Sequence, residues 1–256
     1  MCENAHGQPV GPPSAFLPLP PLRRAATPPL PGAYCTLRPL DPAAHGADLA
    51  AAWAQSPAAA WTYLWAERPA SAAAAAALLA GYAATDDPLH LAVCDAARGG
   101  AAVGTLALMR IDAAQGVCEL GHVNFSSPLV ARSRVATEAV ALALRHAFGL
   151  GFRRVEWKCD ALNAPSVRAA ARYGFAPEGV FREHMVVKGR LRDTAWFALL
   201  AGEWARAAGP ALERWLAPGN FDGAGAQRQA LGALREAAAA GAPAAADAGE
   251  EAEGSE

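Results

Sequence analysis

The spacing of apolar and polar residues predicts one folded domain between residues 33 and 217. Short apolar runs predict strands over residues 34–40, 89–95, 101–111, 117–125, 153–158, 180–187 and 191–200. Helical composition or a helical repeat predicts helices over residues 43–55, 70–84, 135–148 and 163–173. Antiparallel strands followed by a strand–helix–strand crossover predict an α+β fold, in which helices flank a mixed, mostly antiparallel central sheet.

Both ends of the chain fall outside this pattern. Residues 1–32 hold nine of the 20 prolines in dense runs, a composition that favours extended, solvated chain, so we expect a disordered tail there. Residues 218–256 are rich in Ala, Gly and Glu and have few large apolar residues with which to form a core. We expect this second tail to be of low complexity and to lack a fixed fold, even if a helix forms near residues 224–240.

Composition narrows the function classes. Of the 256 residues 53% are hydrophobic, but 68 are alanine, so the large apolar residues must be concentrated in the predicted elements. A net charge of −2 argues against nucleic-acid and anionic-membrane partners. No apolar run is long enough to span a bilayer, and the proline-rich start does not resemble a secretory signal, so we expect a cytoplasmic protein. The five cysteines have no metal-ligand spacing, which predicts no metal site.

The segment from Leu120 to Ala139 is the first candidate for chemistry. It combines the end of a predicted strand, a short loop and the start of a helix. Free backbone N–H groups and the positive end of the helix dipole at such a junction can hold phosphate oxygens, and Arg132 and Arg134 add positive charge. The alternative is an ordinary loop with solvated arginines, and spacing alone does not decide between the two.

Several spaced motifs carry a family resemblance over about residues 33–205. They are Val135-Ala-Thr-Glu-Ala139, Arg153-Arg-Val-Glu-Trp-Lys-Cys-Asp160, Asn163-Ala-Pro-Ser166, Tyr173-Gly-Phe175 and Glu178-Gly-Val-Phe-Arg182. Together they resemble the GNAT acetyltransferases, closest to the ribosomal-protein-alanine branch. The resemblance implies acetyl-CoA as donor, direct transfer to a primary amine in a ternary complex, and a sheet splayed open between its fourth and fifth strands. The oligomeric state stays open, with a homodimer as one alternative.

The resemblance also implies a set of cofactor-binding residues. The backbone of the fourth strand would hold the thioester carbonyl, the loop 131–136 would bind the pyrophosphate, and Asn163 would contact the pantetheine arm. This set comprises His122, Val123, Asn124, Phe125, Arg132, Ser133, Arg134, Val135, Ala136, Thr137 and Asn163. The loop departs from the family pattern, because it begins with Ala131 and has Arg134 where glycine is usual. Backbone N–H donors remain, and Arg134 could itself reach a phosphate.

Acetylation of an amine needs a base for the amine and an acid for the leaving thiolate. Glu119, on the predicted fourth strand, matches a family position for the base, and the alternative is a solvated strand carboxylate. His122, on the opposite side of the pleat, is a second titratable candidate and is more typical of a structural histidine. Ser166 matches the proposed acid of the branch, and the alternative is that Asn163 and Ser166 only cap a helix. The tyrosine that many members use is Ala170 here.

The acceptor is the least determined part of the prediction. Trp61, Tyr63 and Trp65 fall where the family builds its acceptor site, and packing of these rings is the alternative, whereas Trp157 and Trp196 are expected in the core. A small amine or amino acid would need a closed pocket, and a protein N-terminus an open groove. The altered loop and the missing tyrosine also motivate a rival class, a catalytically degenerate GNAT-fold module that binds an acyl-CoA or a protein partner.

Overall fold

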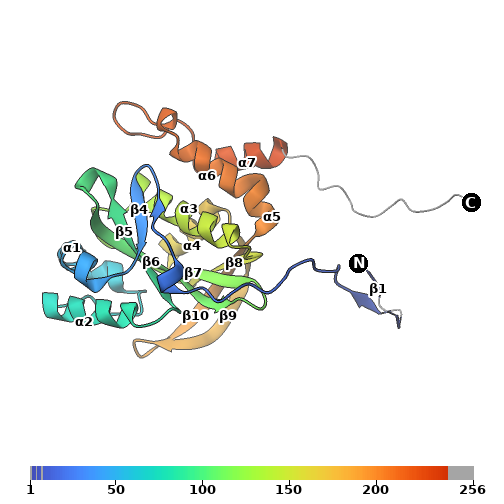
Figure 1. The fold of residues 1–256 in the computed structure, drawn as a ribbon, viewed down its shortest axis with the longest axis horizontal. Helices are drawn as coiled ribbons and strands as arrows, with labels where there is room; N and C mark the ends of the chain where they lie inside the picture. Colours follow the sequence, from blue (N-terminus) through green and yellow to red (C-terminus); the bar gives the residue numbers. More distant parts are fainter. Residues whose placement is uncertain (1, 4, 7, 242–256) are drawn as a thin grey trace, which may run out of the picture.

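The chain folds around one large sheet in a computed structural model that describes residues 2, 3, 5, 6 and 8–241 (Figure 1). The strands are β1 (Cys2–Glu3), β2 (Pro9–Val10), β3 (Leu30–Pro31), β4 (Cys35–Pro39), β5 (Leu89–Asp95), β6 (Ala101–Asp112), β7 (Val117–Asn124), β8 (Arg154–Asp160), β9 (Ala176–Val187) and β10 (Arg190–Leu200). The α-helices are α1 (Pro42–Ala54), α2 (Ala72–Ala83), α3 (Arg134–Gly149), α4 (Ala164–Tyr173), α5 (Ala201–Glu203), α6 (Gly209–Leu216) and α7 (Leu231–Gly241). Short helical turns η1 (Arg24–Ala26), η2 (Ala58–Trp61), η3 (Ala96–Arg98), η4 (Trp204–Ala208) and η5 (Pro218–Asn220) complete the order.

The sheet confirms the α+β class expected from the sequence. Its strand order is β3-β4-β5-β6-β7-β8-β10-β9, and all neighbours are antiparallel except β7 and β8, which are parallel. The parallel pair is joined by α3, the crossover that the helical repeat predicts between two strands. Every strand and helix expected within residues 33–217 is present, and most bounds differ by one or two residues.

Strand β9 is the element whose bounds differ most, because it begins at Ala176 and not near residue 180. It lies at the sheet edge, and almost all of its residues are exposed. An exposed edge strand has no buried face, so apolar and polar residues need not alternate along it. Gly179 has a φ of 147°, and the pairing with β10 shifts register beside it. The alternation of apolar and polar residues that predicts a strand is therefore weakest where β9 begins.

Two hydrophobic cores lie on opposite faces of the sheet. The larger one packs α3, α4 and α6 against the strands, and its members include Val140, Leu144 and Phe152. The smaller one packs α1 and α2 against the other face through Leu49, Trp53 and other side chains. Figure 1 shows α1 and α2 together on one side and α3 with the C-terminal helices on the other. Among the described residues no helix is long and apolar enough to cross a membrane.

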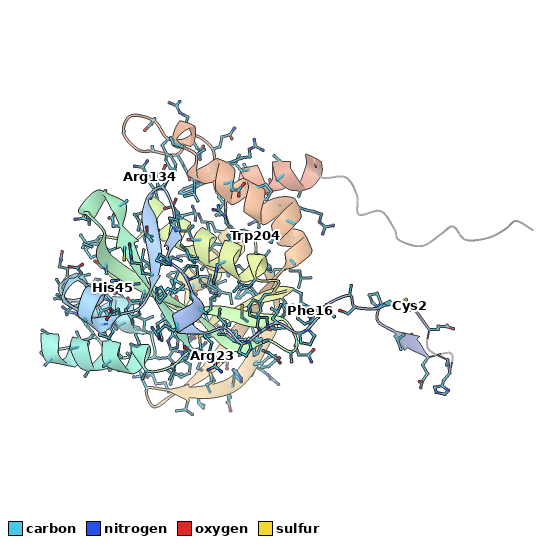
Figure 2. The ribbon with its side chains drawn as sticks, viewed as in Figure 1. Cys2, Phe16, Arg23, His45, Arg134 and Trp204 are labelled. Carbon is cyan, nitrogen blue, oxygen red and sulfur yellow. The ribbon has the colours of Figure 1, made fainter. Side chains whose placement is uncertain are left out.

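The boundary expected at residue 33 is wrong for the part of the N-terminal segment nearest the domain. Leu19 and Leu22 pack against the larger core, and Leu30 pairs with Leu37 of β4. Arg24 donates hydrogen bonds to the carbonyls of Leu40, Tyr82 and Thr85 at 2.8, 3.0 and 2.7 Å. Figure 2 labels Phe16 and Arg23 where the chain reaches the domain and Cys2 on the outlying end. Proline favours extended chain, but apolar side chains between prolines can still pack.

The C-terminal segment also packs further than its composition predicts. Leu231 and Leu234 of α7 are buried in the larger core, and Phe221 lies against it. Arg235 donates to the carbonyls of Ala171 and Arg172 at the end of α4, at 2.6 and 3.0 Å. Two leucines and one arginine dock this short helix, whose other residues are alanine, glycine and one glutamate. Residues 242–256 lie outside the described residues.

Candidate active site

The opening expected between the fourth and fifth strands of the domain is present between β7 and β8. The two strands pair only at Val117↔Arg154, Cys118↔Val155 and Glu119↔Glu156, although β7 continues to Asn124 and β8 to Asp160. Beyond the last pair, the edge of β7 that faces β8 has no strand partner in the described part of the chain. The opening therefore begins at Glu119 and exposes backbone N–H and C=O groups within the sheet.

A bulge in β7 bends the strand at the opening. His122 has a φ of 47°, and the pairing with β6 shifts between Gly121↔Ala107 and Asn124↔Thr105. A bulge leaves one residue unpaired and turns the side chains beside it. Its position next to the opening agrees with the role expected for the β7 backbone, which is to hold the polar groups of a ligand.

A hollow of about 90 Å³ lies at this opening and brings together residues from both halves of the domain. Seven of the residues expected to form the site line it: Tyr63, Trp65, Glu119, His122, Val123, Asn163 and Ser166. Further charged residues that line it are Arg110, Lys158, Asp160 and Arg192. Residues distant in the sequence therefore meet where the expected reaction requires a base, an acid and acceptor contacts.

Glu119 is buried, and two cations hold its carboxylate. Arg110 Nη1 lies 2.8 Å from Glu119 Oε2, and Lys158 Nζ lies 3.3 Å from the same oxygen. Lys158 also contacts Glu156 Oε2 at 2.7 Å, and its ammonium lies 3.9 Å from the centre of the Trp196 ring. The alternative of a solvated surface carboxylate is therefore wrong, because Glu119 is only 4% exposed. The network fixes the position of the carboxylate at the hollow.

His122, which is half-buried, belongs to a cluster with the buried His90 and the half-buried Tyr82. The rings of Tyr82 and His90 stack with centroids 4.0 Å apart, and those of His90 and His122 are 5.0 Å apart. Burial, and secondarily the charge of Arg110, lowers the pKa of His122, so its imidazole is neutral at pH 7. Its Nδ1 atom is buried and has no hydrogen-bond partner among the described residues. His122 is thus a structural member of the cluster and also one wall of the hollow.

Ser166 and Asn163 face the hollow from the start of α4. The Asn163 side chain accepts from Ser166 N at 3.2 Å, so Asn163 caps the helix. The Ser166 hydroxyl oxygen instead accepts from Trp157 Nε1 at 3.0 Å. Ser166 therefore contributes only its backbone N–H to the cap, and the proton of its hydroxyl group can be donated to another group.

The three aromatic residues expected at the acceptor site separate into two groups. Tyr63 and Trp65 line the hollow and are 37% and 43% exposed. The prediction for Trp61 is wrong, because its side chain is 1% exposed, packs edge-to-face on Trp53 and donates to Ser56 Oγ at 2.7 Å. The spacing of apolar residues alone does not show that Trp61 lies in the core while Tyr63 and Trp65, two and four residues later, line the hollow.

The two tryptophans expected in the core also differ. Trp157 is 5% exposed and packs in the larger core, as expected. Trp196 is only half-buried, and it packs against Phe181 and His184 on the same sheet face as Lys158. Trp196 therefore covers the charged group of Lys158 and is not part of either hydrophobic core.

The start of α3 has the geometry expected of an anion site. Ser133 caps the helix by accepting from Ala136 N at 3.1 Å, and Arg132 has a left-handed φ of 57°. The backbone N–H groups of Arg132, Arg134 and Val135 have no acceptor within the part of the chain that the structure describes. Three free donors at a helix start fit the phosphates of a coenzyme A, even without the usual glycine.

Arg134 does not lie free over this loop. Its guanidinium stacks between the rings of Tyr34 and Phe221, 4.8 Å from each ring centre. Figure 2 labels Arg134 between β4 and the C-terminal helices. Stacking occupies the faces of the guanidinium but leaves its N–H edge available for an anion. The contact with Phe221 comes from the segment expected to be disordered, so the sequence did not indicate it.

The remaining expected cofactor residues are more enclosed. Ala136 and Thr137 are buried, and Thr137 Oγ1 accepts from Arg172 at 3.2 Å. Asn124 is buried, and its side-chain oxygen accepts from the Ser126 backbone and hydroxyl at 3.2 and 2.6 Å. Phe125 packs against the core and does not line the hollow. The side chains of these residues pack inside the protein, so only their backbone groups could contact a ligand.

Arg110, Lys158 and Arg192 line the hollow but were not predicted from the sequence. Each is a cation within an interior strand of the sheet, where a buried cation needs a partner. Pairing of β8 alongside β7 puts Lys158 beside Glu119, and that pairing is a long-range property. A list of the cations in the predicted strands would have included all three residues, but not the contacts that they make.

Comparison with known proteins agrees with this geometry. A family model described as an acetyltransferase (GNAT) domain matches residues 35–176, which is more than half of the chain. This chain belongs to the GNAT acetyltransferase family. The α+β fold and the resemblance found in the motifs are thereby confirmed.

Two solved structures and one curated relative are similar to the chain. A GCN5-related N-acetyltransferase from Brucella melitensis is 45% identical, with a TM-score of 0.82, over 87% of this chain and 99% of that one. A probable GNAT-family acetyltransferase from Chromobacterium violaceum is 38% identical, with a TM-score of 0.68, over 77% and 99%. An uncharacterized N-acetyltransferase, p20, from Bacillus licheniformis is 32% identical over 108 residues. That match spans 40% of this chain and 57% of the length of p20.

Proposed function

We propose that the protein transfers an acetyl group from acetyl-CoA to a primary amine by direct attack in a ternary complex. The observation that carries the proposal is the opening in the sheet after Glu119↔Glu156. There a carboxylate and a serine hydroxyl line one hollow, and the helix start with free N–H donors follows β7 along the chain. Membership of the GNAT family supports the same reaction class.

The residues divide into a donor side and an acceptor side. Backbone N–H groups of Arg132, Arg134 and Val135 would bind the phosphates, and the free edge of β7 would hold the pantetheine arm and the carbonyl oxygen. When bound, acetyl-CoA supplies a thioester carbonyl that an amine can attack. Among the described residues, no group of three or more His, Cys, Asp or Glu side chains could hold a metal ion.

Glu119 and Ser166 would move the two protons. The Glu119 carboxylate accepts a proton from the acceptor ammonium through water, and Arg110 and Lys158 keep it in position. The Ser166 hydroxyl donates a proton to the departing sulfur, and the bond from Trp157 Nε1 orients its oxygen. His122 is neutral at pH 7 and also lines the hollow, which makes it the rival base.

A small acceptor fits the site better than a folded protein. Lys188, in the turn between β9 and β10, donates to the Trp61 carbonyl at 2.8 Å and pairs with Glu67 at 3.3 Å. These contacts tie the hairpin to the segment that carries Tyr63 and Trp65, so the acceptor side is bounded from two directions. We therefore propose a small amine or amino acid, with protein N-termini as the alternative.

The test is acetyl transfer followed by mass spectrometry. The full chain is incubated with acetyl-CoA and either a panel of small amines and amino acids or short peptides with free N-termini. We expect acetylated small amines and a loss of at least about a hundredfold in kcat for Glu119→Gln. Transfer to peptides alone would favour the protein-acceptor alternative. Absence of any transfer, with acetyl-CoA still bound, would favour the degenerate module.

A further inference from the structure

Arg192 is a buried cation that the proposed reaction does not use. It lies on β10, is 7% exposed, and lines the hollow at the opening of the sheet. Its Nε atom is buried without a hydrogen-bond partner, and its guanidinium makes no ion pair with any described residue. A guanidinium remains charged in a protein, so its burial is unfavourable unless an anion comes close to it.

The carboxylates near Arg192 are held elsewhere. Glu119 is bound by Arg110 and Lys158. Asp160 accepts from the backbone N–H of Leu162 at 2.9 Å, and its charge, like that of Glu119, acts on Arg192 only from beyond ion-pair distance. The hollow therefore has three cationic side chains and two carboxylates along its wall, and the third cation has no carboxylate of its own.

The position of Arg192 assigns it to the acceptor side. On β10, Thr194 pairs with Asp160 of β8, and Trp196 pairs with Lys158 of β8. Side chains alternate between the two faces of a strand, so Arg192 lies near the face that carries the side chains of Thr194 and Trp196. Its guanidinium lies 5.6 Å from the centre of the Trp65 ring, so it is held beside an aromatic wall of the hollow. Ser166, in contrast, approaches the hollow from α4.

We infer that Arg192 binds a carboxylate of the acceptor, so that the acceptor is a molecule with both a primary amine and a carboxylate. The inference rests on the proposed function, and it narrows the acceptor to amino carboxylates. The planar guanidinium can donate two parallel hydrogen bonds to the two oxygens of a carboxylate. The amine would then be directed to Glu119, and Tyr63 and Trp65 would flank the rest of the molecule.

The test compares acids with their neutral analogues. Acetyl transfer to the common α-amino acids, β-alanine and γ-aminobutyrate is measured against transfer to the corresponding carboxamides. The variants are Arg192→Gln, Arg192→Lys and the control Arg190→Gln, an exposed arginine on the same strand. Binding of the same acids is measured by calorimetry with coenzyme A present, so that affinity is known without turnover. Thermal melting verifies that each variant is folded.

We expect kcat/KM for the best acid to exceed that for its amide by at least about tenfold, since a charge-assisted bond is lost in the amide. Arg192→Gln should bring this ratio close to 1, Arg192→Lys should restore part of it, and Arg190→Gln should leave it unchanged. A purely structural Arg192 would not alter the ratio.

Two results would overturn the inference and leave the proposed function intact. They are equal transfer to acids and amides by the natural chain, and an unchanged ratio in Arg192→Gln. If nothing is acetylated, the proposed function fails, and calorimetry alone tests whether Arg192 binds a carboxylate. Binding of acids that is lost in Arg192→Gln would support this role of Arg192, and absence of binding would overturn the role as well.

Discussion

Replacing Glu138 tests how α3, whose start forms the donor side, is joined to β4 of the sheet. Its carboxylate, on the first turns of α3 and 5% exposed, accepts three backbone N–H groups at the start of β4. Ala33 N lies 2.7 Å from Oε1, and Tyr34 N and Cys35 N lie 2.6 and 2.7 Å from Oε2. A Cβ at Gly32 would lie 2.4 Å from the Glu138 carboxyl carbon, so the chain passes close to this group.

Replacing Glu138 with Gln keeps the volume of the side chain but leaves one acceptor oxygen and one NH2 group. A bond to a charged group contributes about 2 kcal/mol and a neutral one about 1 kcal/mol. Three charged bonds become two neutral ones, so the free energy of unfolding should fall by about 4 kcal/mol, or about 3 kcal/mol if water compensates in part. For a domain of this size the melting temperature should fall by about 6–16 °C.

The assay is urea unfolding followed by tryptophan fluorescence, with Glu213→Gln as the control. Glu213 on α6 makes only an exposed ion pair with Arg145 at 3.5 Å, so its loss should change stability by less than about 1 kcal/mol. An equal effect of the two substitutions would refute the claim that the Glu138 carboxylate joins α3 to β4.

Three further predictions concern the site. Glu119→Gln should leave the acetyl-CoA affinity within about twofold while turnover falls, and unchanged turnover would transfer the role of base to His122. Ser166→Ala should lower kcat about tenfold or more, and it should also cost about 1–3 kcal/mol in thermal melts because Trp157 Nε1 loses its acceptor, whereas Asn163→Ala should cost about 1 kcal/mol; an unchanged kcat in Ser166→Ala would remove Ser166 as the acid. Burial, then His122 and Arg24, lowers the pKa of His90 to about 3. The unfolded chain therefore binds a proton near pH 6.5 that the fold excludes, so stability should fall as the pH drops, by about 2 kcal/mol at pH 5. His90→Phe, which keeps the stacking on Tyr82, should flatten that decline in melts at pH 7 and pH 5, and an unaltered pH dependence would contradict this origin.

The order of the elements within the domain could be predicted because it follows from local patterns. The helix starts illustrate this: Asp41 and Ser71 each accept a backbone N–H two or three residues later, as N-caps do. The terminal segments could not be predicted, because few residues decide their packing. Arg24 docks the N-terminal segment by three carbonyl contacts, and Leu231 with Leu234 docks α7.

The residues of the site likewise divide into those that the sequence locates and those that it does not. The motifs locate Glu119, Asn163 and Ser166, and these three residues do meet at one hollow. Local sequence does not show which strands lie beside one another, so the two cations on Glu119 and the buried Arg192 were not found. Trp61 was assigned to the acceptor because its spacing from Trp65 does not indicate which ring turns into the core.

Isothermal titration of the full chain with acetyl-CoA tests the central claim most directly, with coenzyme A and adenosine 3′,5′-bisphosphate as controls. We expect micromolar binding of acetyl-CoA and much weaker binding of the bisphosphate, because the pantetheine arm would enter the opening after Glu119. Absence of binding at millimolar acetyl-CoA would contradict the proposed donor site. It would mean that the start of α3, with Arg134 stacked between Tyr34 and Phe221, does not form a donor site.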